Sequence, residues 1–378
     1  MKLLQKAILP IGFKAYGVSA GIKKSGKPDL ALFFSDVPCK AACLFTSNKI
    51  QAAPLQLCKE HLKKSKTFQA IIANSGNANC FTGRQGLLDA EKTAILAAKA
   101  LGIKKESILI ASTGIIGRRL PFEKIKAALP KLVSGLSSQG IEQAKLAIMT
   151  TDTFAKTAMI KCQIGAKVIT ISAVAKGVGM IAPNLATMLC FIFTDANISQ
   201  KALKSSLKDA VDNSFNCISV DGCMSTNDTV AILANGQAEN ALIEKEKNLF
   251  TFKNALNLVC LELAKLLIKD AEGASKFIRI KVWGAKNFPQ AKSAALSVAN
   301  SNLFKTACYG ENPNFGRIIV ALGASGVDLK EKDLKIKVSS LKKKDILVDV
   351  WLNQGNSSAV VYTCDLTPEY IRINAEYN

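Results

Sequence analysis

The stretch KGVGMIAPNLATML, residues 176–189, constrains this chain most, because it places a bend between two runs of core sequence. Apolar and β-branched residues occupy 168–174 and 188–193, and such runs are typical of buried strands. Between them, two glycines permit positive φ and Pro183 removes a backbone donor. Thr187 then enters the second run among Ala, Met and Leu. Threonine is a common strand residue, yet two functional interpretations compete with that structural one.

The first interpretation is nucleotide binding. Residues 177–182 fit the pattern G-x-G-x-x-A after a strand, and Asp195 follows at a distance suitable for a ribose contact. In a dinucleotide-binding fold, a helix begins at the second glycine. Pro183 would fall inside the first turns of that helix, and strand-like residues follow closely. Both features argue against nucleotide binding.

The second interpretation is catalysis with Thr187 as the nucleophile. A nucleophilic hydroxyl needs a base to accept its proton. The only histidine, His61, lies in the charged segment 59–64, which is typical of a solvated helix face, so a Thr/His pair is not expected. The remaining base is the α-amine of the threonine itself, which is freed when the bond between Ala186 and Thr187 is cut.

The same stretch resembles the ornithine acetyltransferase (glutamate N-acetyltransferase) family of arginine biosynthesis. The family motif K-G-x-G-M-I-x-P-x-x-A-T-M-L is complete at residues 176–189. Further motifs of the family follow in the right order over nearly the whole chain, at residues 9–13, 73–79, 112–117, 150–153, 272–274, 314–318 and 372–377. The resemblance implies self-cleavage between Ala186 and Thr187, which makes Thr187 a new N-terminus.

The activity implied by this resemblance is a ping-pong reaction. The acetyl group of N-acetyl-L-ornithine passes to Thr187 and then to L-glutamate. The resemblance assigns the oxyanion hole to Thr113 and Gly114, although Thr-Gly at a strand end is by itself usually a turn. It also implies six substrate contacts, which are Thr150, Lys176, Thr187, Glu272, Asn374 and Asn378.

Taken without the resemblance, these contacts have ordinary explanations. Thr150 would belong to an Asx or Ser/Thr turn, Lys176 to the surface, and Glu272 to an exposed helix end. The chain also departs from the family pattern. Relatives end in Thr or Ser where this chain ends at Asn378, so we expect that hydroxyl contact to be absent, and Cys223-Met224 replaces the usual Asp-Thr.

The fold class expected is α/β (α+β). A layered αββα main domain of the N-terminal-nucleophile type is predicted over residues 1–275, and a smaller α+β domain, whose tail returns to the active site, over 276–378. Periodicity predicts helices at 54–64, 86–101, 122–136, 141–149, 198–211 and 245–268. Separate strands are predicted at 30–34 and 42–45, a polar loop at 74–79, and a helix cap at Gly273.

Composition restricts the partners and the compartment. The formal charge is +21, but the lysines are spread without interleaved aromatic residues, which favours a solvated surface over nucleic-acid binding. Eleven cysteines without a C-x-x-C pair indicate reduced thiols rather than disulfides or zinc, and no apolar run reaches membrane-spanning length. We therefore expect a cytoplasmic protein without membrane, nucleic-acid or metal partners.

The resemblance implies small-molecule substrates and no resident cofactor. Whether acetyl-CoA is a second acetyl donor stays open from the sequence. The expected assembly is a heterotetramer of two α chains (1–186) and two β chains (187–378). Two other functions compete with the acetyltransferase. A related self-processing aminopeptidase or amidohydrolase would not be accelerated by glutamate, and a nucleotide- or nucleic-acid-binding protein would need neither cleavage nor the Thr187 hydroxyl.

Overall fold

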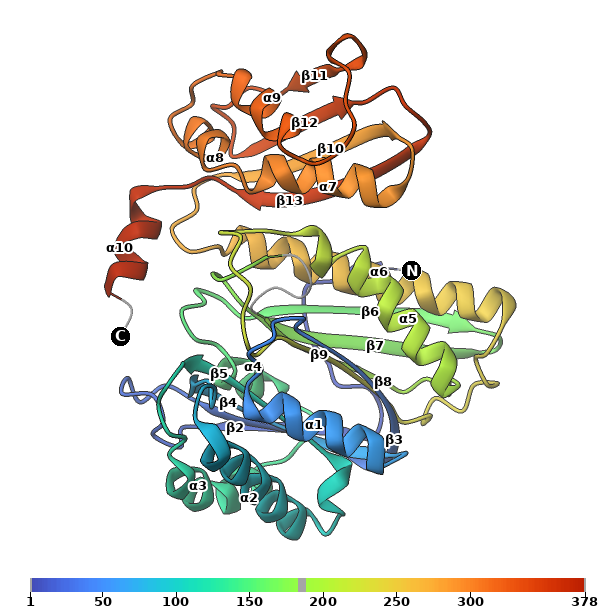
Figure 1. The fold of residues 1–378 in the computed structure, drawn as a ribbon. Coiled ribbons are helices and arrows are strands. Elements are labelled where there is room, and N and C mark those ends of the chain that lie inside the picture. Colours follow the sequence, from blue (N-terminus) through green and yellow to red (C-terminus); the bar gives the residue numbers. More distant parts are fainter. Residues whose placement is uncertain (1, 183–187, 377–378) are drawn as a thin grey trace. The chain divides into compact units, whose positions relative to one another are not determined.

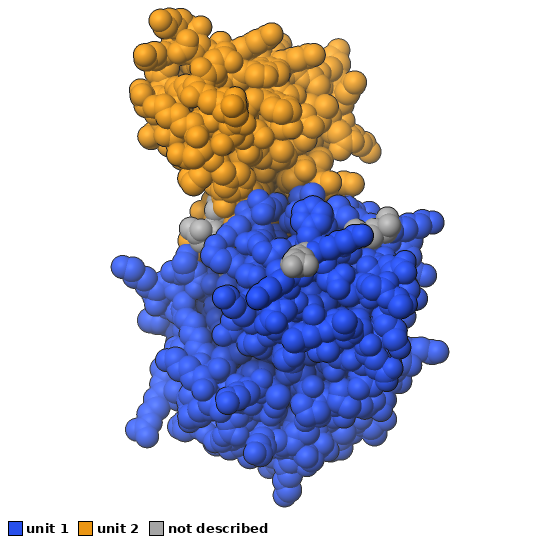
Figure 2. All heavy atoms as spheres, turned by 90° about the vertical axis from the view of Figure 1, so that its right-hand side faces the viewer, with its two compact units in different colours: residues 1–177, 187–213, 225–263 blue, residues 178–186, 214–224, 264–378 orange. Residues whose placement is uncertain are grey.

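The computed structural model describes residues 2–182 and 188–376, except for the side chain of Glu246. The chain divides into two compact units (Figure 2). Unit 1 comprises residues 1–177, 187–213 and 225–263, and unit 2 comprises residues 178–186, 214–224 and 264–378. The division falls inside the 176–189 stretch, because the chain leaves unit 1 after Gly177 and re-enters it at residue 187.

Unit 1 is built on a nine-stranded sheet system with the order β1-β6-β7-β8-β9-β3-β4-β5, in which β2 pairs with β3. The strands are β1 (Lys2–Leu4), β2 (Phe13–Val18), β3 (Leu30–Phe45), β4 (Phe68–Asn77), β5 (Ile108–Ile115), β6 (Lys156–Ile164), β7 (Lys167–Lys176), β8 (Leu189–Thr194) and β9 (Thr229–Ala234). Every residue of β8 and β9 is buried, as expected for strands covered on both faces.

The long strand β3 connects two layers of this system. Its first part pairs with β2 and β4, whereas residues 40–45 pair with β9. The prediction of two separate strands at 30–34 and 42–45 is therefore wrong. The pairing register with β4 shifts between Phe34 and Cys39, so the polar residues between the two apolar runs lie in an irregular part of one continuous strand.

The two layers pack face to face through aromatic side chains. The ring of Phe33 lies 5.3 Å from that of Phe191 and 5.2 Å from that of Phe193, and Phe13 lies 5.3 Å from Phe193, all between ring centroids. Such spacings are typical of favourable aromatic contacts in a core. The predicted two-sheet core is therefore confirmed.

Helices cover the outer faces of both layers (Figure 1). They are α1 (Ala53–Lys64), α2 (Gly83–Leu101), α3 (Phe122–Ser134), α5 (Gln200–Asp212) and α6 (Glu246–Lys269). Helix α4 (Ile141–Ala147) instead packs on the side of β2 that carries Phe13, since a Cβ on Gly17 would lie 2.4 Å from the carbonyl oxygen of Gln143. All six predicted helices are confirmed, with ends displaced by three residues or fewer. Local chemistry fixes some of these ends, since Ser199 caps α5 by accepting a hydrogen bond from the backbone of Ala202.

Three local predictions are corrected by the structure. His61 is buried on α1, and its Nδ1 lies 2.8 Å from the carbonyl oxygen of Ile108, so it does not belong to a solvated face. Residues 74–77 continue strand β4 instead of forming a loop, because they pair with β5. Helix α6 ends at Lys269, so Gly273, although its φ is +66°, lies beyond the cap position.

Unit 2 carries a four-stranded sheet of order β11-β12-β10-β13. Its strands are β10 (Phe277–Ala285), β11 (Lys335–Val338), β12 (Asp345–Trp351) and β13 (Ser357–Cys364), and its helices are α7 (Phe288–Ala299), α8 (Asn302–Tyr309), α9 (Gly316–Gly323) and α10 (Pro368–Glu376). Burial alternates along β10, which is typical of a sheet with one face in the core. The mixed α/β class predicted for the chain is confirmed.

Among the residues that the structure describes, no helix is long and apolar enough to span a membrane. The same residues contain no group of three or more His, Cys, Asp or Glu side chains arranged to hold a metal ion.

Candidate active site

A buried lysine and a buried threonine meet in unit 1. Lys176 ends β7, and its Nζ donates a hydrogen bond to the Thr113 hydroxyl oxygen, in β5, at 3.1 Å. Lys176 is 3 % exposed and Thr113 is 5 % exposed. A buried ammonium needs polar groups and counter-charges around it, and the charges of Asp152 and Asp228 act on Lys176. The structure brings these two predicted site residues together.

Gly114 follows Thr113, and the backbone conformation at this position requires glycine. Its φ is +133°, and a Cβ at this position would lie 2.4 Å from the carbonyl carbon of Gly76 in β4. Only glycine fits this conformation and this close approach. Strand β5 also continues through Thr113 and Gly114 to Ile115, so these residues do not end the strand as predicted. Pairing of Asn77 with Ile115 explains the extension.

Asp152 is the residue of this cluster that the sequence analysis did not assign. Its fully buried carboxylate accepts a bond from Lys156 Nζ at 2.6 Å and another from the backbone N–H of Gly177 at 2.8 Å. The backbone N–H of Thr150 donates to the same carboxylate at 2.9 Å. This bond runs from residue 150 to a side chain two positions later, which is the reverse of an Asx turn. Asp152 thereby fixes both the predicted substrate contact Thr150 and the residue after Lys176.

Lysine charges act on the buried Asp152 carboxylate. Burial raises the pKa of Asp152, but the charges of Lys176 and Lys156, together with hydrogen bonds, outweigh burial and hold the pKa at about 2. Lysine side chains are suited to binding a carboxylate-bearing ligand. Two features of the sequence could have pointed to Asp152. It lies in the polar motif Thr-Thr-Asp-Thr, and Lys156 follows it by four residues.

A third lysine approaches the same cluster from the segment before β3. Lys23 is half-buried, and its backbone N–H donates to the buried carboxylate of Asp29 at 2.9 Å. Burial lowers the pKa of Lys23 to about 8; Asp29 opposes this lowering, and the charge of Lys176 adds to it. Lys23 consequently titrates in the range in which many enzymes are assayed, which matters for any pH profile of this site.

A second buried aspartate, Asp228, binds the backbone just after the predicted cleavage point. The carboxylate oxygen of Asp228 accepts the backbone N–H of Met188 at 3.0 Å, and the Asp228 side chain is fully buried. Burial raises the pKa of Asp228 well above its usual range. Met188 leads into β8, so Asp228 sets the position at which the chain enters that strand. The predicted nucleophile Thr187 and the preceding Ala186 lie outside the described residues.

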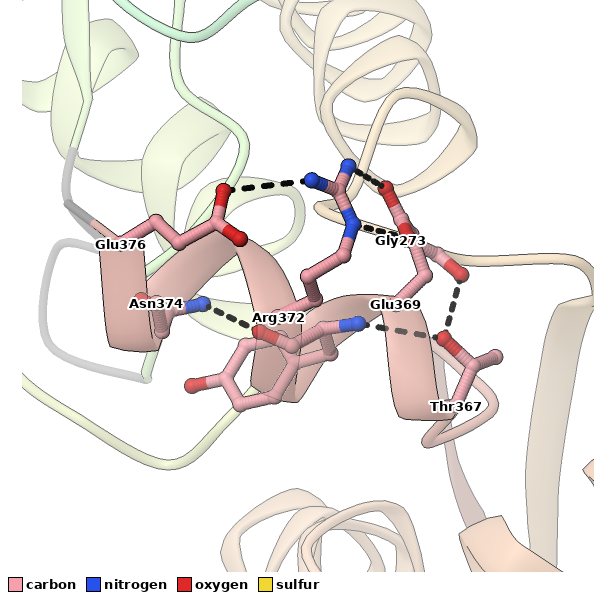
Figure 3. Close-up of polar contacts among 7 residues, drawn as sticks. Gly273, Thr367, Glu369, Arg372, Asn374 and Glu376 are labelled. Atoms are coloured by element: carbon pink, nitrogen blue, oxygen red, sulfur yellow. Dashed lines mark hydrogen bonds and ion pairs between the residues drawn. The ribbon is translucent and has the colours of Figure 1, made fainter.

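The remaining predicted contacts form a second cluster, in unit 2. The side-chain amide of Asn374, in α10, donates to the Glu272 carboxylate at 3.0 Å. Helix α10 is anchored at its start, where the Thr367 hydroxyl donates to the carbonyl of Gly273 at 2.7 Å (Figure 3). The structure therefore brings Glu272 and Asn374 together. Asn378 lies outside the described residues.

The nucleotide-binding interpretation does not agree with the structure. Residues 178–182 form no helix, and Met180 has a positive φ of +56°, which is incompatible with a right-handed helix. Asp195, the proposed ribose contact, is buried and accepts the backbone N–H of Thr170 at 2.7 Å. The glycines of this stretch therefore serve a bend between strands and not a phosphate-binding turn.

The buried Lys176–Thr113 pair, with Asp152 and Lys156, marks a candidate active site in this layered α/β fold. The model of the ArgJ family matches residues 14–378, and the chain belongs to this family. A similar relative is the arginine biosynthesis bifunctional protein ArgJ of Geobacter sulfurreducens, which is 43 % identical over 388 residues covering 97 % of this chain and 98 % of the relative.

Similarity extends to eukaryotes and to solved structures. The mitochondrial arginine biosynthesis bifunctional protein ArgJ of Dictyostelium discoideum is 40 % identical over 97 % of this chain and 92 % of its own. A crystal structure of ornithine acetyltransferase from Mycobacterium tuberculosis, complexed with ornithine, is 36 % identical over 48 % of this chain and 97 % of that chain, with a TM-score of 0.44.

Proposed function

We propose that this enzyme moves the acetyl group of N-acetyl-L-ornithine to L-glutamate in arginine biosynthesis, through an acetyl ester on Thr187. Membership of the ArgJ family supports this proposal, as do the names of its relatives. The observation in the structure that carries it is the buried Lys176–Thr113 pair beside Gly114, because a hydroxyl and a cation fixed next to an exceptional backbone position suit a developing oxyanion.

Self-cleavage would supply both the nucleophile and its base. The Thr187 hydroxyl oxygen bonds to the carbonyl carbon of Ala186, the peptide C–N bond breaks, and the hydroxyl proton passes to the leaving amine. Water then hydrolyses the ester, which releases the Ala186 carboxylate and restores the hydroxyl. In turnover, the free amine of Thr187 accepts the hydroxyl proton as the hydroxyl oxygen attacks the acetyl carbonyl, while Thr113 and Gly114 stabilise the oxyanion. The amide C–N bond then breaks, and the proton passes to the leaving amino group of ornithine. The amino group of glutamate next attacks the acetyl ester, the ester C–O bond breaks, and a proton from that amino group returns to the Thr187 oxygen.

Charge complementarity supports the choice of substrates. A lysine such as Lys176 suits a substrate carboxylate, and the backbone of Thr150 is held close by through Asp152. The Glu272 carboxylate suits a cationic amino group, which ornithine carries. We assign Asn374 and Asn378 as further substrate contacts.

The proposed assembly consists of α chains 1–186 and β chains 187–378, two of each, in the cytoplasm. No resident cofactor is needed for this reaction, since acyl transfer here uses a side-chain hydroxyl and an amine. The relatives are named as bifunctional proteins, so acetyl-CoA is the second donor to test.

The deciding experiment is an acetyl-transfer assay with N-acetylornithine, with and without glutamate, on wild type and Thr187→Ala. We expect acetylglutamate formation that saturates with glutamate and is absent in the variant. Release of free acetate at a rate that glutamate leaves unchanged would instead identify an amidohydrolase. Replacing N-acetylornithine by acetyl-CoA in the same assay decides whether the enzyme has two donors.

A further inference from the structure

In unit 2, one carboxylate holds the residues that lead to the proposed cleavage point. Asp221 accepts the backbone N–H of Met180 at 2.6 Å and that of Ile181 at 3.0 Å. The same carboxylate accepts the N–H of Cys223 at 3.0 Å and the hydroxyl of Tyr370 at 3.1 Å. Two of these four donors, the N–H groups of Met180 and Ile181, belong to this segment, so Asp221 fastens it at two successive residues.

The backbone that Asp221 holds is conformationally unfavourable. Met180 has φ of +56°, in the left-handed region that L-residues other than glycine, asparagine and aspartate rarely adopt. Such a conformation persists only when its surroundings impose it. Both N–H groups around this residue end on Asp221, so this carboxylate supplies the main restraint on the turn.

Additional bonds fix both ends of the same segment. The backbone N–H of Glu272 donates to the Val178 carbonyl at 2.9 Å, and that of Val220 donates to the Ile181 carbonyl at 2.9 Å. Between these points, a Cβ on Gly179 would lie 2.3 Å from a carboxylate oxygen of Glu272, so a larger residue would displace that carboxylate. Residues 178–181 are thus held in one path only five residues before Ala186.

The C-terminal helix α10 takes part in this arrangement through Tyr370. Burial, followed by the charge of Asp221, raises the pKa of Tyr370 far above the neutral range, so the phenol stays a hydrogen-bond donor to Asp221. The backbone N–H of Tyr370 donates to the Thr367 hydroxyl. That hydroxyl in turn donates to the carbonyl of Gly273 (Figure 3). Docking of α10 therefore orients the acid that holds the turn.

We propose that Asp221 is a positioning residue for self-cleavage, which holds the turn at Met180 in the conformation that presents the following chain for cutting, and that Tyr370 of the C-terminal helix orients Asp221 in this role. This inference rests on the proposed self-cleavage at Ala186–Thr187. It adds a residue of the maturation step to the catalytic and substrate-binding residues described above.

The test follows newly synthesised full-length chain by cell-free translation with a labelled pulse, measuring the cut fraction against time. Losing the restraint on one left-handed residue should slow the cleavage of Asp221→Ala about tenfold. Asp221→Asn, which keeps one acceptor oxygen, should lie between wild type and Asp221→Ala. Tyr370→Phe should give a smaller slowing, since the backbone bonds to Asp221 remain.

Glycine adopts a positive φ without cost, so Met180→Gly should restore most of the cleavage rate in the Asp221→Ala background. The matched control is Asp365→Ala. Asp365 is buried in the same unit and likewise accepts two successive backbone N–H groups, those of Ser275 and Lys276, each at 2.9 Å. Its loss should lower thermal stability while leaving the rate of cleavage unchanged.

The outcomes separate this inference from the proposed function. A wild-type chain that never cleaves removes self-cleavage and this inference with it. A wild-type chain that cleaves, with Asp221→Ala cleaving equally fast, overturns the inference alone. Failure of Met180→Gly to rescue, or equal slowing in Asp365→Ala, would also overturn it, because both results would reduce Asp221 to a general stabilising residue. If Asp221→Ala does not fold, Asp221→Asn with and without Met180→Gly gives the same decision.

Discussion

Two buried lysines in this molecule make the same contact with a threonine and have different surroundings. Lys176 donates to Thr113 at 3.1 Å in unit 1, and Lys305 in α8 donates to Thr363 at 3.0 Å in unit 2. The two lysines are 3 % and 2 % exposed. Residue type, burial and distance therefore do not distinguish a reaction centre from a structural contact.

The two sites differ in the groups that surround each lysine–threonine pair. Lys305 also donates to the Cys364 carbonyl at 2.5 Å, and the Thr363 hydroxyl donates onward to the carbonyl of Ala299 at 3.3 Å, so both groups tie a helix to a strand. Thr113 instead precedes Gly114, whose backbone conformation excludes every other residue, and Lys176 shares its charge environment with Lys156 and Asp152. A strained backbone and uneven charge are features of functional sites.

The largest effect should come from replacing the two lysines in parallel. We expect Lys176→Met to reduce turnover of cleaved protein by about 10³-fold, at the upper end for loss of one oxyanion-stabilising group. Lys305→Met should leave turnover unchanged but lower the free energy of unfolding by about 1–3 kcal/mol, because buried acceptors lose their donor. Steady-state kinetics measure the turnover of both variants, and denaturant unfolding measures their free energies of unfolding. An equal loss of turnover in both variants would contradict the distinction between the two sites.

The second largest effect should come from replacing the two threonines in parallel. Thr113→Ala should reduce turnover by about 10²–10³, or roughly 3–4 kcal/mol of transition-state stabilisation, with cleavage checked separately by intact mass. Thr363→Ala is the control and should affect stability only. A mature Thr113→Ala enzyme with wild-type turnover would remove Thr113 from the mechanism.

The charge balance around Lys176 predicts a loss of stability in acid. Because the folded pKa of Asp152 is about 2, below its usual 3.8, its ionised form stabilises the fold above pH 4, and this contribution disappears as the pH falls toward 2. The shift corresponds to about 2 kcal/mol. Unfolding curves between pH 5 and 2 should show this slope in wild type and not in Asp152→Asn. The exposed Asp209→Asn is the control and should retain the slope.

The smallest expected effect is a displaced pH–rate profile. Activity should rise with pH as the Thr187 amine loses its proton. We expect a midpoint at or below about 7.7–8.0, because the family resemblance assigns Lys176 to the same substrate site and a nearby positive charge disfavours the ammonium. In the residual activity of Lys176→Met the midpoint should move upward. Lys23→Met is a necessary control, because the pKa of Lys23, about 8, falls in the same range.

His61→Gln completes the pH experiment. His61 contacts Ile108, at the opposite end of β5 from Thr113, which places it about 16 Å away at the rise of an extended strand. We expect unchanged turnover in the cleaved variant. If His61→Gln abolishes turnover while Lys176→Met leaves the profile in place, the amine is not the base.

The sequence predicted most of what depends on local periodicity and little of what depends on long-range contacts. Buried runs such as β8 and the helices were identified because their hydrophobic spacing is distinctive. The continuity of β3 was not, since its pairing partners are distant in sequence. The burial of His61 was not predicted, because the neighbouring lysines suggest an exposed helix face. Only the packing of α1 in the folded protein shows that His61 points inward.

The candidate site shows the same limit. Thr113, Lys176, Glu272 and Asn374 were named by resemblance, and the structure pairs them as Lys176 with Thr113 and Glu272 with Asn374. Asp152 and Asp221 could not be assigned, because an aspartate in a polar turn is usually a local capping residue. Their importance appears only when backbone N–H groups from 25 and 40 or more positions away are seen to end on them.

The central claim is that Thr187 becomes an N-terminus and carries the acetyl group. The most direct test is intact-mass measurement of the protein before and after mixing with N-acetylornithine in the absence of glutamate. We expect two chains, 1–186 and 187–378, with one acetyl group gained by the second chain and lost again when glutamate is added. A single uncut chain with full activity, or an acetyl group that never appears on residues 187–378 during turnover, would contradict it.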